Sequence, residues 1–301
     1  KKGEEMVKDL QMKYQTLQQK QASGELAPVE IEKQAAALKQ EEAKLGEFEQ
    51  SIANAIHHFL PNERLIYFGD TVHLPYGDKS ADAIRYYSLR ISKFLLEQDC
   101  KMIIIACNSA SSAAYDMLLD FFEGKALFVN VVDPLVNAVI SQAYKNVGVI
   151  ATKATINSSI YKNKIKSLNQ KVKVNQVATP LLAPMIEEGF YSGNISKSVI
   201  ENYLSHPDLK NIDALLLACT HYPLIRNEIN EYYSGQVAIL DSTDVVRDEV
   251  KRILTEEGLL CENRIGHDAF YVSDYTSSFE ETAKNFYVFV SCDKSDDNQS
   301  V

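Results

Sequence analysis

Long apolar runs and an excess of positive charge are both missing from this sequence of 301 residues. No apolar run approaches the roughly 20 residues that a membrane-spanning helix needs. The opening stretch, Lys1-Lys2-Gly3-Glu4-Glu5, contains no apolar core of a signal peptide. The net charge of −10 argues against a nucleic-acid groove, which needs a positive field. We therefore expect a cytoplasmic protein with no membrane or nucleic-acid partner.

Cysteine is scarce and irregularly spaced. The five cysteines, an odd number, are Cys100, Cys107, Cys219, Cys261 and Cys292, which argues against a disulfide framework. Neither a Walker loop nor a G-x-G-x-x-G motif is present, so no nucleotide is indicated. Cys219 and His221 have the spacing of zinc ligands, but no second Cys/His pair accompanies them. We expect reduced thiols, no metal and no cofactor.

The composition changes near residue 52. Residues 1–51 are rich in Gln, Glu, Lys and Ala, and apolar residues such as Leu10, Tyr14 and Leu17 recur at helical spacing. Gly24 and Pro28 interrupt this pattern, as at the end of one helix and the start of the next. The segment is typical of a helical hairpin or coiled-coil arm, and a solvated helix without a partner stays open as the alternative.

The rest of the chain alternates between short apolar runs and helical stretches. The strand-like runs cover residues 64–68, 101–106, 126–132, 146–151, 171–177, 214–218, 236–240 and 269–272. The helical stretches between them include residues 80–97, 109–121, 154–167, 193–205 and 243–256. This alternation predicts an α/β fold with parallel sheets that are flanked by helices. The runs are apolar throughout, as expected of strands with both faces covered.

Two of these runs end in Ala-Cys. "IIIACNSAS" (103–111) and "LLLACTHYP" (215–223) place Cys107 and Cys219 where a strand ends, which is where open parallel sheets bind ligands. Backbone N–H groups there can bind a carboxylate, and a helix N-terminus is expected to lower the pKa of each thiol. Two facing thiols suit the movement of a proton from one face of a carbon to the other. A lone cysteine after a strand is more often a core residue, but two matching ones favour chemistry.

His221 lies two residues after Cys219. It is a candidate to deprotonate or orient that thiol, as in other Cys–His pairs. A histidine that caps a helix is the alternative. The remaining histidines have no such neighbour, and we expect them to be surface or structural residues: His57, His58, His73, His206 and His267.

Three motifs carry a resemblance to a known family. "IYFGDTVHLPYGDKS" (66–80), "ACNSASSAA" (106–114) and "LLACTHYPLI" (216–225) make residues 52–287 similar to the glutamate racemases of the cofactor-independent aspartate/glutamate racemase family. The resemblance implies two pseudo-symmetric lobes with the active site between them. It also implies an isomerase that interconverts L- and D-glutamate and supplies D-glutamate for peptidoglycan, hence for cell wall biogenesis and cell shape.

The resemblance also implies roles for individual residues. Cys107 and Cys219 resemble the two proton-transfer residues, with His221 and a Glu of "APMIEEGF" assisting the second. That Glu is Glu187 or Glu188, and we expect Glu187. The implied substrate-binding residues are Tyr76, Gly77, Asn108, Ser109, Thr220 and His221. Asp70 is expected to be structural, and Tyr76 could equally form a wall of the cleft.

The chain departs from the family at both ends of the resemblance. Glutamate racemases open with a strand that ends in Asp-Ser-Gly-x-Gly-Gly, and no such segment is present. Residues 1–51 instead resemble the helical arm of a Skp-type periplasmic chaperone. The expected parts are a helical arm (1–51), lobe A without its first strand (52–131 plus 242–287), lobe B (132–241) and a disordered tail (288–301).

The missing segment leaves several functions open. We expect a glutamate racemase that is impaired by loss of the Asp-Ser-Gly segment. One alternative is a racemase for another acid such as aspartate. A second alternative is an inert racemase-like fusion that acts as a helical interaction or oligomerisation protein. The sequence also leaves a homodimer open.

Overall fold

The computed structural model describes residues 52–274 and eight residues before them. Those eight residues are helical: Met12, Lys13, Thr16, Leu17, Lys20, Glu30, Ile31 and Gln34. The rest of the predicted arm, the part of lobe A after residue 274 and the predicted tail lie outside the described residues. Residues 52–274 belong to one compact unit, which is described by itself below.

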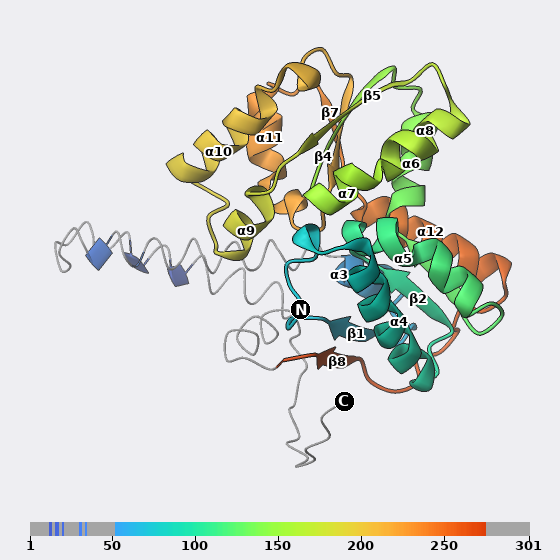
Figure 1. Cartoon of the computed structure of the whole chain (residues 1–301). Coiled ribbons are helices and arrows are strands. Elements are labelled where there is room, and N and C mark those ends of the chain that lie inside the picture. Colours follow the sequence, from blue (N-terminus) through green and yellow to red (C-terminus); the bar gives the residue numbers. More distant parts are fainter. Residues whose placement is uncertain are drawn as a thin grey trace. The chain divides into compact units, whose positions relative to one another are not determined.

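Lobe B is built on one continuous parallel sheet. Its strands are β4 (Asn146–Ala151), β5 (Lys173–Ala178), β6 (Ala214–Ala218) and β7 (Ala238–Leu240), in the order β5-β4-β6-β7 (Figure 1). The central strand β4 pairs along its length with β5 on one edge and β6 on the other. All five residues of β6 are buried, as the uniformly apolar sequence predicts.

Helices cover both faces of this sheet. They are α6 (Val132–Ser141), α7 (Lys153–Ser158), α8 (Ile160–Leu168), α9 (Leu182–Glu187), α10 (Asn194–Leu204) and α11 (Arg226–Tyr232), with single turns η2 (Pro207–Leu209) and η3 (Tyr222–Ile225). Side chains alternate along a strand, so Val147 and Val149 share one core with Tyr161 of α8. On the other face a Cβ at Gly148 would lie 2.8 Å from the Cδ1 methyl group of Ile212, so a larger residue there would require that side chain to move.

Lobe A has two separate pairs of parallel strands. β1 (Ile66–Gly69) pairs with β8 (Ala269–Val272), so segments from opposite ends of the described chain lie side by side (Figure 1). β2 (Met102–Ile105) pairs with β3 (Leu127–Asn130). The helices of lobe A are α3 (Ile52–Phe59), α4 (Ala81–Glu97), α5 (Asn108–Phe121) and α12 (Thr243–Glu256), with one turn η1 (Tyr76–Asp78). The predicted α/β fold with parallel sheets is thereby confirmed.

The two lobes share part of their strand order. β2 and β6 each end at Ala-Cys, and each pairs with the strand that follows it in the chain, β3 or β7. β1 precedes β2 through α4 as β5 precedes β6 through α9 and α10. In lobe B, β4 lies between β5 and β6. Within residues 52–274, no strand pairs with the second edge of β1 or of β2.

Polar side chains tie the segments of lobe A together. The buried carboxylate of Glu63, just before β1, lies 2.7 Å from Nζ of Lys101, just before β2. Lys101 also donates to the carbonyl of Leu259 at 2.5 Å and contacts Sγ of Cys261 at 3.2 Å. The backbone N–H of Cys261 donates to Glu63 at 2.8 Å. These contacts, which we call the Lys101 clamp, connect three parts of lobe A without a shared sheet.

Two of the differences between predicted and observed bounds have a clear local cause. The predicted strand over 126–132 ends at Asn130, because the Asn130 side chain accepts hydrogen bonds from the backbone N–H groups of Val132 and Asp133, both at 2.8 Å, where α6 begins. The predicted helix over 154–167 is divided into α7 and α8 at Ser159. The φ of Ser159 is 54°, in the left-handed region, which a continuous helix cannot include.

Candidate active site

Cys107 lies at the junction of β2 and α5, where it is the N-cap residue of the helix. The backbone N–H groups of Ser109 and Ala110 and the side chain of Ser109 stabilise its thiolate form. Burial acts in the opposite direction and is the larger effect, so the pKa of Cys107 is raised. This corrects the predicted lowering: the helix N-terminus is present, but desolvation outweighs it.

Cys219 follows β6 directly and is 8% exposed. Burial raises its pKa to about 12, against the N–H groups of His221 and Thr220, which favour the thiolate. The predicted lowering is therefore wrong here too. The element that follows Cys219 is the single turn η3 rather than an α-helix, so this thiol has the weaker helix terminus of the two.

The two thiols affect one another. A negative charge on Cys107 is among the causes that raise the pKa of Cys219. Coulomb interactions of this kind require short separations or a low local dielectric. Negative charges at Cys107 and Cys219 also raise the pKa of Tyr76 and Tyr161, respectively, so each thiol lies near a tyrosine.

A histidine and a carboxyl group extend from Cys219. Nδ1 of His221 lies 3.6 Å from Sγ of Cys219, and Nε2 of the same ring lies 3.4 Å from a carboxylate oxygen of Glu187. Burial lowers the pKa of His221, whereas burial and then the charge of Glu188 raise the pKa of Glu187. One imidazole thus connects the thiol to Glu187, a geometry suited to moving a proton. Glu188 acts on this group only as a neighbouring charge.

Asn108 is 3% exposed and makes a contact from lobe A to lobe B. The hydroxyl of Tyr161, on α8, donates to Oδ1 of Asn108 at 2.5 Å. Nδ2 of Asn108 is buried and has no hydrogen-bond acceptor among the described residues. Buried amide groups are normally paired, so a free donor here points to a ligand that supplies the acceptor.

Ser109 also reaches lobe B. Its hydroxyl lies 2.9 Å from that of Thr152 and 3.4 Å from that of Thr155. Gly77 packs on the same threonine, since a Cβ at residue 77 would lie 2.7 Å from Cβ of Thr152. Neither Thr152 nor Thr155 is among the residues predicted for the site from the sequence. Thr152 comes directly after β4. Residues that follow the carboxyl end of a parallel strand are candidates for ligand binding, and this criterion, applied to β2 and β6, would also have identified Thr152.

Tyr76 lies in a polar network around Asp70. Its hydroxyl donates to Asp70 at 2.5 Å, His73 contacts the same carboxylate at 2.7 Å, and Ser273 donates at 2.8 Å. Burial opposes the charge of Asp70, but these hydrogen bonds lower its pKa. The His73 ring stacks on Tyr87 with centroids 3.8 Å apart. Asp70 therefore holds Tyr76 and the loop before Gly77 in place.

Thr220 differs from the other predicted substrate-binding residues because it is exposed. Its only contact with the thiols is through its backbone N–H, which favours the Cys219 thiolate. Within the described residues no group of three or more His, Cys, Asp or Glu side chains could hold a metal ion. No helix in the same part of the chain is long and apolar enough to cross a membrane.

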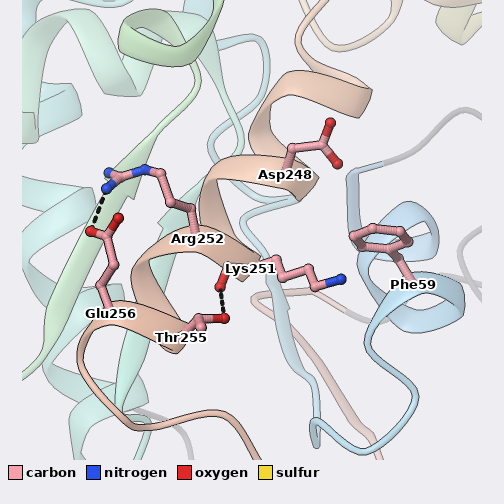
Figure 2. A pocket seen from close by; sticks show the side chains of 6 residues that line it. All are labelled: Phe59, Asp248, Lys251, Arg252, Thr255 and Glu256. Carbon is pink, nitrogen blue, oxygen red and sulfur yellow. Dashed lines mark hydrogen bonds and ion pairs between the residues drawn. The ribbon is translucent and has the colours of Figure 1, made fainter.

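A separate surface hollow lies on α3 and α12 (Figure 2). Its lining residues are Phe59, Asp248, Lys251, Arg252, Thr255 and Glu256, none of which is a predicted site residue. Lys251 extends toward Phe59 (Figure 2), with Nζ 4.7 Å from the ring centroid. The residues around the two thiols, rather than this hollow, form the candidate active site.

Comparison with known proteins identifies the family of this chain. The profile of the Asp/Glu/Hydantoin racemase family matches residues 47–250. "Glutamate racemase 3" of Caldanaerobacter subterraneus subsp. tengcongensis is 37% identical over 236 residues, which cover 78% of this chain and 85% of that protein. The glutamate racemase of Chlorobaculum parvum is 36% identical over 240 residues, or 78% of this chain and 87% of that protein.

A solved structure is similar over the same region. The crystal structure of Francisella tularensis glutamate racemase in complex with D-glutamate has a TM-score of 0.74 and 36% identity, and the match covers 79% of this chain and 89% of that one. Residues before 47 lie outside the family match, and the likeness of residues 1–51 to a Skp-type arm stays a prediction. The chain belongs to the Asp/Glu/Hydantoin racemase family.

Proposed function

We propose that this protein is a cofactor-independent isomerase that interconverts L- and D-glutamate. The observation that carries the proposal is the pair of thiols, Cys107 and Cys219, which follow corresponding strands of two lobes and interact electrostatically. Relatives with the name glutamate racemase, over most of their length, support glutamate as the substrate. Within the cell, D-glutamate of this origin would enter peptidoglycan, and the reduced thiols fit a cytoplasmic location.

The reaction needs a base on one face of the α-carbon and an acid on the other. One thiolate removes the α-proton, so an S–H bond forms, the C–H bond breaks and its electron pair stays on the substrate. The second thiol then gives its proton to the opposite face and becomes a thiolate. The carbon is inverted, no electron leaves the substrate, and proton exchange with water restores the first state.

Because the pKa values of both thiols are raised, a positive charge on the substrate is needed to stabilise the thiolate. Without ligand, we expect both thiols to be protonated near neutral pH, because desolvation raises the pKa of the buried Cys219 and of the partly buried Cys107. The α-ammonium group of glutamate brings a positive charge beside them, which favours the thiolate. We therefore infer that substrate binding itself activates the base. Neutral donors near Cys107, Nδ2 of Asn108 and the hydroxyls of Ser109 and Thr152, can bind the substrate carboxylates.

The two thiols receive unequal help. Cys219 has the His221–Glu187 connection, with separations of 3.6 Å and 3.4 Å, and we propose Glu187 rather than Glu188 as the assisting acid. Among the described residues, no acidic side chain is a cause of the pKa shift of Cys107. The Asp of the family's opening segment would have supported Cys107, so we expect catalysis that is slower than an intact family member provides.

The test follows racemisation by circular dichroism from each enantiomer of glutamate, with aspartate as the competing substrate. We expect the signal to decay to zero from both enantiomers of glutamate, and much more slowly with aspartate. In D2O the product should carry deuterium at Cα while unreacted substrate keeps hydrogen. Faster turnover of aspartate would favour the alternative racemase, and no turnover of either acid would favour the inert alternative.

A further inference from the structure

Tyr161 and Asn108 form a fully buried polar contact between the lobes at the proposed site. Tyr161 is 1% exposed and Asn108 is 3% exposed. The Tyr161 ring belongs to the apolar core of lobe B, together with Val147, Val149 and Ile165. Its hydroxyl reaches out of that core to Oδ1 of Asn108 at 2.5 Å. A hydroxyl on so firmly packed a ring is held in one place.

The direction of this hydrogen bond fixes the orientation of the Asn108 amide. Burial, and then the charges of Asp133 and Cys219, raise the pKa of Tyr161, so the phenol keeps its proton. In the structure it donates that proton to Oδ1 of Asn108. A donor selects the oxygen of the amide, not the nitrogen. Oδ1 therefore faces lobe B, and the two N–H groups of Nδ2 face away from Tyr161.

The orientation decides what the amide offers to a ligand. Nδ2 is buried and has no acceptor within the described residues. Asn108 is also the residue directly after Cys107. If the amide turned over, a carbonyl oxygen would replace the N–H groups, and it would repel a carboxylate instead of binding it.

We propose that Tyr161 is a positioning residue for substrate binding: its hydroxyl holds the Asn108 amide with Nδ2 directed to a carboxylate of the substrate. The inference rests on the proposed function, because it assigns the acceptor that Nδ2 lacks to a carboxylate of glutamate. Tyr161 itself touches no reacting atom in this proposal and acts only through Asn108.

The experiment replaces Tyr161 by Phe, which keeps the packed ring and removes the hydroxyl. We expect the KM for both enantiomers of glutamate to rise at least about tenfold, while kcat changes less than about threefold, since the lost contact is made in ground and transition state alike. Tyr115→Phe is the matched control, because Tyr115 donates to the carbonyl of Phe128 at 3.3 Å, and its KM should not change.

A double variant separates positioning from packing. Asn108→Ala alone should raise KM by at least as much as Tyr161→Phe. In that background Tyr161→Phe should change KM by less than about twofold, because the group that it positions is gone. Equal effects of Tyr161→Phe in both backgrounds would mean that the hydroxyl acts through packing, and would overturn the proposal.

A measurement on the unaltered protein tests the contact of the Asn108 amide with the substrate directly. With 15N-labelled asparagine, the side-chain amide of Asn108 should give a single resonance pair that shifts when glutamate is added. The pair is assigned by its absence in Asn108→Ala. A protein that racemises glutamate with no shift at Asn108, or with an unchanged KM in Tyr161→Phe, would refute the positioning role and leave the proposed function intact. A protein that neither binds nor racemises glutamate would overturn both.

Discussion

Lobe A and lobe B each place a cysteine after a buried strand, but they are held together by different forces. The sheet of lobe B is continuous, and its strands β4 and β6 are almost entirely buried. The strands of lobe A are divided into two pairs, and β1 and β8 contain no buried residue. The position that β4 occupies in lobe B has no strand within residues 52–274 of lobe A.

The difference shows which part of a parallel sheet is needed to position a side chain at its end. Cys107 needs only β2, its pairing with β3 and the start of α5, and all of these are present. No strand takes the place of β4 in the described part of lobe A. The Lys101 clamp, a set of contacts around the buried Glu63 carboxylate, connects its segments instead. Such contacts are directional, whereas the apolar contacts of lobe B are not. A polar clamp can therefore hold segments in place without a shared sheet, but it depends on pH.

The largest expected effect tests whether the two lobes contribute equally to chemistry. Cys107→Ala and Cys219→Ala should each reduce racemisation by about a thousandfold or more, as loss of a general acid or base does. In D2O each variant should exchange the α-hydrogen of only one enantiomer, and the two variants should act on opposite ones. Mass spectrometry of the recovered glutamate measures this. Exchange of both enantiomers by either variant would contradict the two-thiol mechanism.

A second prediction compares the sheets directly. Amide hydrogens of β1 and β2 should exchange with deuterium on the order of a hundredfold faster than those of β4 and β6, because unpaired edges open more easily. Hydrogen exchange followed by mass spectrometry of peptic fragments gives the rates. Equal protection in the two lobes would mean that another segment covers the edges of β1 and β2.

The third prediction concerns the Lys101 clamp. Lys101→Met should lower the free energy of unfolding by about 2 kcal/mol at neutral pH, since it leaves the Glu63 carboxylate buried without its partner. Lys93→Met is the control, because Lys93 and Glu97 are exposed and 3.9 Å apart, and it should cost less than about 0.5 kcal/mol. Urea unfolding measures both. Equal costs would mean that the clamp contributes nothing specific.

The same clamp predicts a pH dependence. Burial alone would raise the pKa of Glu63, but hydrogen bonds from Lys101 and from the backbone N–H of Cys261 lower it below its usual value. The stabilisation is therefore complete above the unfolded pKa of about 4.3 and is lost as the pH falls through the lower folded pKa. Lys101→Met should reduce this loss on acidification. An unchanged pH dependence in the variant would argue against the clamp.

The smallest effect tests the His221–Glu187 connection, which extends from Cys219. His221→Asn should lower kcat/KM about tenfold by removing the link from Cys219 to Glu187. The loss must be equal from both enantiomers, because L- and D-glutamate have the same free energy. Glu187→Gln should have a weaker effect in the same direction, and Glu188→Gln, its neighbour, should have almost none. An equal effect of Glu187→Gln and Glu188→Gln would remove Glu187 from the proposed role.

Much of the fold could be predicted because lobe B and most of lobe A obey local rules. Each of the eight strand-like runs overlaps an observed strand, and the bounds of β4, β6 and β8 agree with the runs 146–151, 214–218 and 269–272. The strand bounds near Asn130 and the break at Ser159 could not be predicted, since they depend on a side-chain cap and on one left-handed residue.

The site was predictable only in part. Cys107 and Cys219 follow strands, so the position of each could be inferred from the sequence. The direction of their pKa shifts could not, because it depends on burial in the folded chain. The contact of Tyr161 with the site could not be predicted either, because its hydroxyl reaches Asn108, 53 residues away, only in the tertiary structure.

The raised pKa values of the two thiols also affect how readily oxidants and electrophiles react with the protein when no substrate is bound. Oxidants and electrophiles attack the thiolate and not the thiol. Because burial raises the pKa of Cys107 and Cys219, the resting protein presents them in their unreactive form. In the proposed mechanism the thiolate forms only when the α-ammonium group of the substrate lies beside it, so we expect the ligand-free thiols to react slowly with peroxide and alkylating agents.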